Sequence, residues 1–282
     1  MNLENILPKD GPAIDQVNKY INKYSNDYIV IKCGGSVLLD EILFNQLIED
    51  ISILNKLGLK IILVHGGGKN IKKKLDEAKI ISNFINGLRV TNSEIIELVK
   101  DALNELNQEI VNKLKNKNCN GVSFSASHNN IINVSPLSKN LGYVGEPTNV
   151  NVMQIIKEIS DKKVPVIAPM GLDKNNRLFN INADTTAGAV AKEINSRRLL
   201  LMTDVPGILN KEKKLIPEIY SKNAKEMIKD QTITGGMIPK INTCLDAVNN
   251  GVTGVVIVDG RKSHSILFEI FSDKGAGTLI RK

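Results

Sequence analysis

An apolar run that ends in a lysine and two glycines places the strongest constraint on this fold. Residues 29–36 read Ile-Val-Ile-Lys-Cys-Gly-Gly-Ser, which predicts a buried strand whose carboxyl end opens into a turn. In parallel sheets, ligands bind at that end. Gly34 and Gly35 let backbone N–H groups approach an anion, and Lys32 adds a positive charge beside them. The motif predicts a phosphate site, although an ordinary strand end with a solvated lysine has the same pattern.

A second glycine-rich turn follows the next predicted strand, residues 60–64. There, His65-Gly66-Gly67-Gly68-Lys69 leads into a helix, whose N-terminus offers free N–H groups and partial positive charge to an anion. The string lacks the spacing of a Walker A loop, and a dinucleotide-binding fingerprint would need glycine where Ile71 stands. A tight turn without a ligand is the alternative. We expect His65 to shape this loop rather than to act as a base.

Predicted strands and helices alternate along the chain, which indicates the α/β class. Gly58 ends the first long helix, and short β-like pieces over 119–150 predict hairpins that decorate the first lobe. The remaining expected strands cover 164–168, 199–203 and 254–259, and the main helices cover 39–57, 91–115, 185–194 and 236–250.

The N-terminal segment predicts a separate amphipathic helix. Pro12 suits a first helical turn, and Ile14, Val17, Ile21 and Tyr24 recur at helical spacing. An apolar stripe ahead of the first strand requires a partner. It could cover its own domain or dock on another subunit.

Composition narrows the possible compartment and partners. The three cysteines of this 282-residue chain are widely spaced and match no metal motif, which favours a reducing compartment. The N-terminus lacks a signal-peptide core and no apolar run could span a membrane, so we expect a cytoplasmic protein. The net charge of +7 is scattered, and aromatic residues make up only 4%. These features favour small anions over nucleic acid as ligands.

Arg89 and two asparagines are candidates for substrate contacts. Arg89 comes just before the long helix for which Thr91 and Glu94 form a predicted capping box. An arginine at the mouth of a helix can bind a carboxylate through two parallel hydrogen bonds, while a solvated surface arginine is the commoner alternative. Asn180 and Asn182 alternate in an extended segment, so both amides should face the same way.

Asp184 and Lys240 lie near predicted helix starts. Asp184 could be the N-cap of the helix over 185–194, or it could bridge lysines from two loops. Lys240 lies one turn into the helix opened by Gly235 and Gly236, where it can reach the same anion. Two lysines at glycine turns, an acid and an arginine suit phosphoryl transfer, which depends on positioning and charge neutralisation. A carboxylate acceptor is already ionised at neutral pH and needs only orientation.

Six motifs together resemble those of N-acetylglutamate kinases, a group of the amino acid kinase family. The resemblance runs from about Ile29 to the C-terminus and rests on the order and joint spacing of Lys32-Cys33-Gly34-Gly35, His65-Gly66-Gly67-Gly68, Gly87-Leu88-Arg89-Val90-Thr91, Asn180-Ile181-Asn182-Ala183-Asp184, Asp204-Val205-Pro206-Gly207-Ile208-Leu209 and Gly236-Met237-Ile238-Pro239-Lys240. It implies an αβα sandwich around a mainly parallel sheet. The implied reaction is MgATP-dependent phosphorylation of the side-chain carboxylate of N-acetyl-L-glutamate, the second step of arginine biosynthesis.

By position, the resemblance implies a role for each matching residue. Lys32 and Lys240 would stabilise the migrating phosphoryl group, and Asp184 would orient both lysines. The residues implied to bind the substrate are Gly67, Gly68, Arg89, Asn180 and Asn182. Those implied to bind ATP are Gly34, Gly35, Asp204, Val205, Gly207, Ile208, Leu209, Gly236 and Met237. Mg²⁺ would be held mainly by phosphates and water, with no protein metal site.

The C-terminal tail is similar to the signature of family members that arginine inhibits. His264, Glu269 and Gly275 would then belong to the effector site. Such members carry an N-terminal helix and assemble through it as hexamers, so the resemblance implies a trimer of dimers. The implied division is an oligomerisation arm over 1–27, an acetylglutamate-binding lobe over 28–195, and a lobe for ATP and arginine over 196–282.

Two other functions stay open on the sequence. The chain could be another amino acid kinase, acting on aspartate, glutamate, carbamate or a nucleotide. It could instead be a non-catalytic amino-acid sensor that keeps the fold, although the presence of Lys32, Asp184 and Lys240 argues against this.

Overall fold

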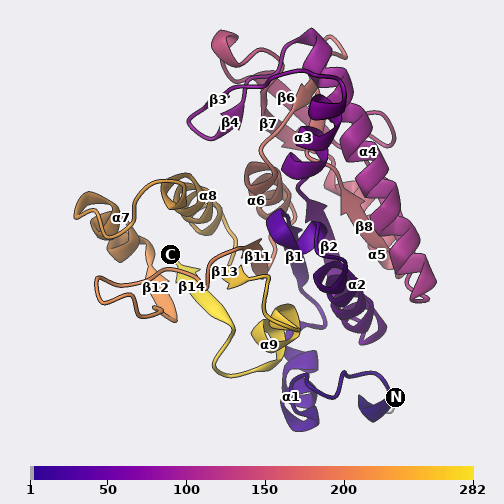
Figure 1. The fold of residues 1–282 in the computed structure, drawn as a ribbon. Helices are drawn as coiled ribbons and strands as arrows, with labels where there is room; N and C mark the ends of the chain where they lie inside the picture. The colour runs from indigo at the N-terminus through magenta and orange to yellow at the C-terminus, as the bar shows by residue number, and fades with distance from the viewer. Residues whose placement is uncertain (1–2) are drawn as a thin grey trace.

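An eight-stranded sheet forms the centre of the computed structural model, which describes residues 3–282 (Figure 1). Its strand order is β12-β14-β13-β11-β1-β2-β8-β5, and β13 and β14 are the antiparallel pair in an otherwise parallel sheet. The strands are β1 (Tyr28–Cys33), β2 (Lys60–His65), β5 (Gly121–Phe124), β8 (Val164–Ile167), β11 (Arg198–Thr203), β12 (Glu218–Tyr220), β13 (Val255–Asp259) and β14 (Gly277–Arg281). The expected α/β class with a mainly parallel sheet is confirmed.

Helices cover both faces of this sheet and make it the middle of three layers. One core contains apolar residues of α1 (Ile14–Tyr24), α2 (Glu41–Lys56), α4 (Ser93–Asn116) and α9 (Ser265–Phe271), and the opposite core contains those of α5 (Val152–Ser160), α6 (Ala183–Glu193), α7 (Ser221–Lys229) and α8 (Met237–Asn249). Successive residues of β1 point to opposite faces: Ile29 and Ile31 enter the first core, and Val30 enters the second. Lys32 is two residues after Val30, so its side chain points to the same face, the one that carries α6 and α8.

Two small sheets build the upper end of the molecule, beside α3 (Gly68–Glu77) and α4 (Figure 1). The four-stranded sheet has the order β10-β9-β6-β7, and β3 pairs with β4 as a hairpin. These strands are β3 (Phe84–Ile85), β4 (Leu88–Arg89), β6 (Ile132–Pro136), β7 (Gly145–Val150), β9 (Met170–Leu172) and β10 (Leu178–Asn180), and short 3-10 turns cover Leu3–Asn5, Gly35–Leu38 and Lys139–Leu141. The expected antiparallel decoration of the first lobe is present as β6 and β7.

Two helix starts differ from the sequence prediction. The N-cap of α4 is Asn92, whose Oδ1 accepts hydrogen bonds from the Glu94 and Ile95 N–H groups at 3.1 and 2.8 Å. The predicted Thr91 capping box is wrong, because the Thr91 hydroxyl is buried and donates to the Arg89 carbonyl at 2.9 Å. Asn182 likewise caps α6, which places Asp184 inside the first turn.

The amphipathic N-terminal helix is present as α1 and packs against α9 of its own chain (Figure 1). Val17, Tyr20 and Tyr24 are buried there, and the Tyr20 hydroxyl donates to Asp273 at 2.5 Å. Ile14 at the start of the helix stays 38% exposed. The stripe therefore finds a partner within the chain and leaves an exposed apolar residue at one end.

Within residues 3–282, no helix is both long enough and apolar enough to cross a bilayer.

The segment from Asp204 to Leu209 is fixed to β14 by a fully buried threonine. The Thr278 hydroxyl donates to the Ile216 carbonyl at 2.6 Å and accepts from the Ile208 N–H at 2.9 Å. A Cβ on Gly207, whose φ is +140°, would lie 2.6 Å from the Thr278 hydroxyl oxygen. Glycine is therefore required where the segment passes over β14.

We expect Thr278→Val to lower the free energy of unfolding by about 1–3 kcal/mol. Valine keeps the volume of threonine but leaves the buried Ile208 N–H and the partly buried Ile216 carbonyl without this partner. Chemical denaturation monitored by circular dichroism measures the change. Thr148→Val is the matched control, because that hydroxyl also bonds to a backbone carbonyl but is exposed. Equal stability of the two variants would contradict the anchoring role of Thr278.

Candidate active site

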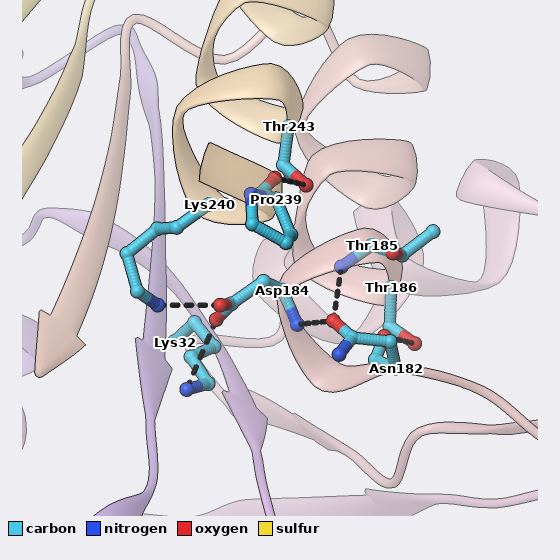
Figure 2. Close-up of polar contacts among 8 residues, drawn as sticks. All are labelled: Lys32, Asn182, Asp184, Thr185, Thr186, Pro239, Lys240 and Thr243. Atoms are coloured by element: carbon cyan, nitrogen blue, oxygen red, sulfur yellow. Dashed lines mark hydrogen bonds and ion pairs between the residues drawn. The ribbon is translucent and has the colours of Figure 1, made fainter. Parts of the chain in front are cut away.

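Asp184 bridges two lysines that are far apart in the sequence (Figure 2). Its Oδ1 lies 3.0 Å from the Lys32 Nζ and its Oδ2 lies 2.5 Å from the Lys240 Nζ. All three side chains are at most 15% exposed. Burial alone would raise the pKa of Asp184, but the charges of Lys32 and then Lys240 outweigh it and hold the pKa at about 2. The carboxylate is therefore ionised throughout the neutral range.

Three elements deliver these charges to one point. Lys32 lies near the carboxyl end of β1, and Asp184 is the second residue of α6. Lys240 is the fourth residue of α8, directly after Pro239. Proline is tolerated there because N–H groups of the first helical turn have no partner within the helix. Of the two alternatives for Asp184, the structure shows the lysine bridge and not the N-cap.

The triple-glycine turn lies beside Lys32. The Gly66 N–H donates to the Cys33 carbonyl at 2.7 Å, which ties the turn to the end of β1. A Cβ on Gly67 would lie 2.3 Å from Leu103 Cδ2, inside the packing of α4, whereas a Cβ on Gly68 would meet no atom within 4 Å. Glycine at position 67 therefore permits the close contact between the turn and α4.

Every residue predicted to bind the substrate lines one cavity. The cavity has a volume of about 220 Å³, and its lining includes Lys32 together with Gly67, Gly68, Arg89, Asn180 and Asn182. Arg89 Nη2 donates to the Gly68 carbonyl at 3.1 Å, and a second hydrogen bond joins Nη1 to the Ser82 hydroxyl. Burial lowers the pKa of Arg89, but a guanidinium stays charged at neutral pH. The cavity thus combines a fixed cation with amide groups.

Sequence reasoning missed Ser82 and Phe84, which both contact Arg89, and Phe84 lines the cavity as well. The Arg89 guanidinium lies over the Phe84 ring, 4.7 Å from its centroid, an arrangement in which the ring attracts the cation. Phe84 remains 58% exposed although it lines the cavity. The sequence feature that could have indicated this contact is the presence of Phe84, an aromatic residue a few positions before Arg89.

A second cavity, of about 370 Å³, adjoins the lysine bridge on the side of α8. Asp184, Lys240 and Gly236 line it together with Asn182. Asn182 thus lines both cavities, and Lys32 and Lys240 each line one of them. A ligand spanning both would pass the two ammonium groups.

The residues predicted to bind ATP fall into three groups. Gly34, Gly35 and Asp204 lie together, because the Ser36 hydroxyl donates to Asp204 Oδ1 at 2.5 Å and a Cβ on Gly35 would lie 3.0 Å from Asp204 Oδ2. Gly236 lines the second cavity. The remaining residues line neither of the two cavities: they are Val205, Gly207, Ile208, Leu209 and Met237. Val205 is 37% exposed, while Gly207 and Ile208 rest on Thr278.

His65 lies behind the glycine turn and is fully buried. Burial lowers its pKa to about 4, so the imidazole is neutral at neutral pH. Its Nδ1 lies 2.8 Å from the Gly66 carbonyl oxygen. The ring contacts the loop, as expected of a residue that shapes it.

Glu269 and Gly275 line a third cavity, about 280 Å³ in volume, between α1 and β14. His264 lies outside it. Its Nδ1 is 2.6 Å from Asp50 Oδ1 on α2, and its Nε2 is 3.4 Å from Asp10. The hydrogen bond to Asp50 raises the pKa of His264. The three predicted effector residues are therefore divided between a cavity and a buried ion pair.

Among residues 3–282, no cluster of three or more His, Cys, Asp or Glu side chains is arranged to hold a metal ion.

Comparisons with known proteins agree with the fold and the motifs. Residues 27–259 match the model of the amino acid kinase family. The chain is 57% identical to an acetylglutamate kinase of Pelagibacter ubique, covering 99% of this chain and 97% of that protein, and 44% identical to one of Clostridioides difficile, covering 93% and 94%.

A solved structure extends the likeness to the fold itself. N-acetylglutamate synthase of Neisseria gonorrhoeae, in complex with coenzyme A and N-acetylglutamate, superposes with a TM-score of 0.86 at 20% identity. The match covers 95% of this chain and 62% of that one. The family match and the curated relatives together show that this chain belongs to the amino acid kinase family, in which those relatives are acetylglutamate kinases.

Proposed function

We propose that this chain is an N-acetyl-L-glutamate kinase. It transfers the ATP γ-phosphoryl group to the side-chain carboxylate of N-acetyl-L-glutamate, giving N-acetyl-L-glutamyl 5-phosphate and ADP. The bridge from Lys32 through Asp184 to Lys240 is the observation that carries the proposal, because it concentrates positive charge between two cavities. The curated relatives, which match nearly the full chain, support the choice of acceptor.

The transfer needs charge neutralisation more than proton transfer. A carboxylate oxygen of the acceptor attacks the γ-phosphorus while the bond from that phosphorus to the bridging β-γ oxygen breaks, and ADP carries away the electron pair. Lys32 and Lys240 neutralise the charge that spreads over the equatorial oxygens. Asp184 holds both ammonium groups in place. The acceptor is ionised at neutral pH, so no general base is required.

Binding of the acceptor is assigned to the cavity that contains Arg89. Its guanidinium suits the α-carboxylate, and the amides of Asn180 and Asn182 suit the acetamido group. Gly67 and Gly68 offer backbone N–H groups at the start of α3. The acceptor would thereby lie in the lobe formed by residues 28–195.

Binding of ATP is assigned to the lobe formed by residues 196–282. In this lobe Gly236 lines a cavity with Asp184 and Lys240, and from the other lobe Gly34 lies beside the Lys32 ammonium group. Gly35 and Asp204 would complete this side of the site, and the segment to Leu209 with Met237 would contact the rest of the nucleotide. Mg²⁺ would arrive with ATP, held by phosphate oxygens and water, since it prefers oxygen ligands and keeps much of its hydration.

The cavity between α1 and β14 is proposed to bind arginine as an inhibitor. Glu269 is partly buried, and loss of solvent raises its pKa; it accepts from the Ala276 N–H at 2.7 Å. No cationic side chain within residues 3–282 lies at ion-pair distance from it. A partly buried carboxylate with no ion pair at contact distance suits a guanidinium, although the charge of Arg198 in the same cavity also acts on it. Lys23 and Arg281 in this cavity suit the ligand carboxylate. His264 would act indirectly, by fixing the start of α9.

The oligomer is proposed to be a hexamer formed through the arm of residues 1–27, of which residues 1 and 2 lie outside the described part. The exposed end of α1 at Ile14 supports this. We propose a cytoplasmic location on the composition of the chain.

The decisive activity experiment compares acceptors in a coupled assay of ADP release. We expect N-acetyl-L-glutamate to be the preferred acceptor over glutamate, aspartate and carbamate. We further expect Lys32→Ala and Asp184→Asn to lower kcat by about 10²- to 10³-fold, because each removes part of a preorganised charge array. Lys72→Ala is the control, since that side chain is 68% exposed and pairs with Asp76 on the surface of α3.

Two outcomes would refute the proposal. Equal rates on glutamate would point to another amino acid kinase, and undiminished turnover by Lys32→Ala would point to a sensor without this chemistry. The pKa of Asp184 is about 2, so the carboxylate is already ionised at neutral pH. The kcat of the wild-type enzyme should therefore not fall near neutral pH because of protonation of Asp184.

We expect Glu269→Gln to raise the arginine concentration needed for half-inhibition by roughly tenfold or more, while leaving the uninhibited rate unchanged. The amide keeps the shape but removes the charge that would face the guanidinium. Glu212→Gln is the control, because that carboxylate is 70% exposed, pairs with Lys214 and lies outside the cavity. Insensitivity of the wild-type enzyme to millimolar arginine would exclude the effector site.

Light scattering on the full chain should give the mass of a hexamer of 31.0 kDa subunits. Ile14→Lys should weaken hexamer assembly, because the exposed end of α1 is the proposed contact, and should keep kinase activity, because Ile14 lies outside the lysine bridge and both substrate cavities. A full-length dimer would contradict the proposed assembly without affecting the catalytic assignment.

A further inference from the structure

His65 is a fully buried titratable group that the proposed reaction does not use. It ends β2, directly before the glycine turn, and faces α4. Its ring contacts two partners: Nδ1 lies 2.8 Å from the Gly66 carbonyl oxygen, and Nε2 lies 3.0 Å from Nδ2 of Asn107. The imidazole thus connects the substrate loop to the middle of a long helix.

The orientation of the Asn107 amide is fixed by a third group. Asn107 is buried on α4, and its Nδ2 also lies 3.0 Å from the carbonyl oxygen of Val166 on β8. A backbone carbonyl only accepts hydrogen bonds, so Asn107 must present its NH₂ group to it. The flipped amide would lose this hydrogen bond and place its oxygen against the carbonyl.

Both N–H groups of the Asn107 amide have hydrogen-bond partners, whereas its oxygen has none. Within residues 3–282, the buried Oδ1 of Asn107 has no hydrogen-bond partner. Leaving a buried acceptor unpaired is unfavourable, which indicates that the position serves to donate. One N–H is directed at Val166, and the other is directed at His65.

This donation decides the tautomer of His65. Because Nε2 accepts from Asn107, the proton of the neutral ring resides on Nδ1 and is donated to the Gly66 carbonyl. Burial, which lowers the pKa of His65 to about 4, keeps a second proton off the ring at neutral pH. Each partner in the series Val166, Asn107, His65 and Gly66 therefore has a single hydrogen-bonding role.

Anchoring the Gly66 carbonyl also orients the next N–H group. In a trans peptide the C=O and N–H bonds point in opposite directions, so the Gly67 N–H is directed away from the His65 ring. Within residues 3–282, the N–H groups of Gly67 and Gly68 donate to no protein acceptor. Both residues line the cavity that contains Lys32 and Arg89.

We propose that Asn107 and His65 are positioning residues, which lock the Gly66–Gly67 peptide so that the Gly67 N–H faces a substrate anion. The inference rests on the proposed kinase function for its catalytic consequence, and on hydrogen-bond geometry alone for the tautomer. The two parts can be tested separately.

The tautomer is tested by ¹⁵N NMR of histidine-labelled wild-type protein, with the His65 resonances identified by their loss in His65→Asn. We expect a protonated, pyrrole-type Nδ1 and an unprotonated, pyridine-type Nε2 at neutral pH. The reverse pattern would overturn the proposal. This measurement requires no activity, so it is independent of whether the chain phosphorylates N-acetylglutamate.

The catalytic part is tested by two substitutions that each keep one nitrogen position. His65→Asn retains an amide near Nδ1 and can still donate to the Gly66 carbonyl, whereas His65→Gln retains an amide near Nε2 and cannot. We expect kcat/KM for the acceptor to fall by roughly 10- to 100-fold in His65→Gln and to stay within roughly fivefold in His65→Asn. The KM for MgATP should not change. Equal losses in the two variants would indicate packing alone and overturn the proposal.

Asn107 is tested by Asn107→Leu, which keeps a similar volume but removes both donors. We expect the proton of the His65 ring to be shared between Nδ1 and Nε2, so that the Nδ1 chemical shift moves away from the pyrrole-type value. We also expect kcat/KM for the acceptor to fall by about tenfold. Gln108→Leu on the exposed face of α4 is the control. Thermal unfolding of each variant shows whether it is folded. A folded Asn107→Leu with the wild-type tautomer and wild-type kinetics would overturn the role of Asn107.

Discussion

The structure depends on a charge arrangement in which one buried carboxylate holds two ammonium groups. Two cations brought this close repel each other, and the repulsion grows where little water screens it. Asp184 contacts both Lys32 and Lys240, so it offsets the repulsion and most of the cost of burial. The three charges still sum to one positive charge. The arrangement is therefore stable without a ligand and remains attractive to a phosphoryl group.

The topology of the sheet explains why these charges can meet. β1 lies between β2 and β11, so the strand that carries Lys32 adjoins strands of both predicted lobes. In open α/β sheets, ligands bind at the carboxyl ends of strands where the strand order reverses. The two-residue periodicity of β1 then turns Lys32 toward the face covered by α6 and α8. The strand order of the sheet and the alternation of side chains along β1 therefore determine where Lys32 lies, independently of the loop conformations.

Local signals in the sequence pointed to the residues of this centre, while the bridging role of Asp184 was one of two alternatives until the structure showed it beside both lysines. Glycines after a strand, a lysine beside them and the alternating asparagines are visible in short windows. The errors arose where neighbouring residues compete for one role: Asn92, not Thr91, caps α4, because the Thr91 hydroxyl is committed to the Arg89 carbonyl.

Other contacts could not be predicted because they join distant segments. Asn107 reads as a polar residue in a helix, and only the packing of α4 on β2 and β8 shows that its amide reaches His65 and Val166. Thr278 is similar, since its two partners lie in the segment that precedes β12. Sequence periodicity places such residues on a buried face but does not identify the group that each one meets.

The strand β14 provides a physical connection between the proposed effector cavity and the proposed nucleotide segment. Gly277 lines the cavity that contains Glu269, and the next residue, Thr278, holds the Ile208 N–H. A Cβ on Gly277 would lie 2.0 Å from the Ile257 carbonyl oxygen, so β14 packs against β13 without free space. A closely packed strand transmits a shift instead of absorbing it. Occupation of the cavity would therefore act on the segment from Asp204 to Leu209 through adjacent residues of one strand.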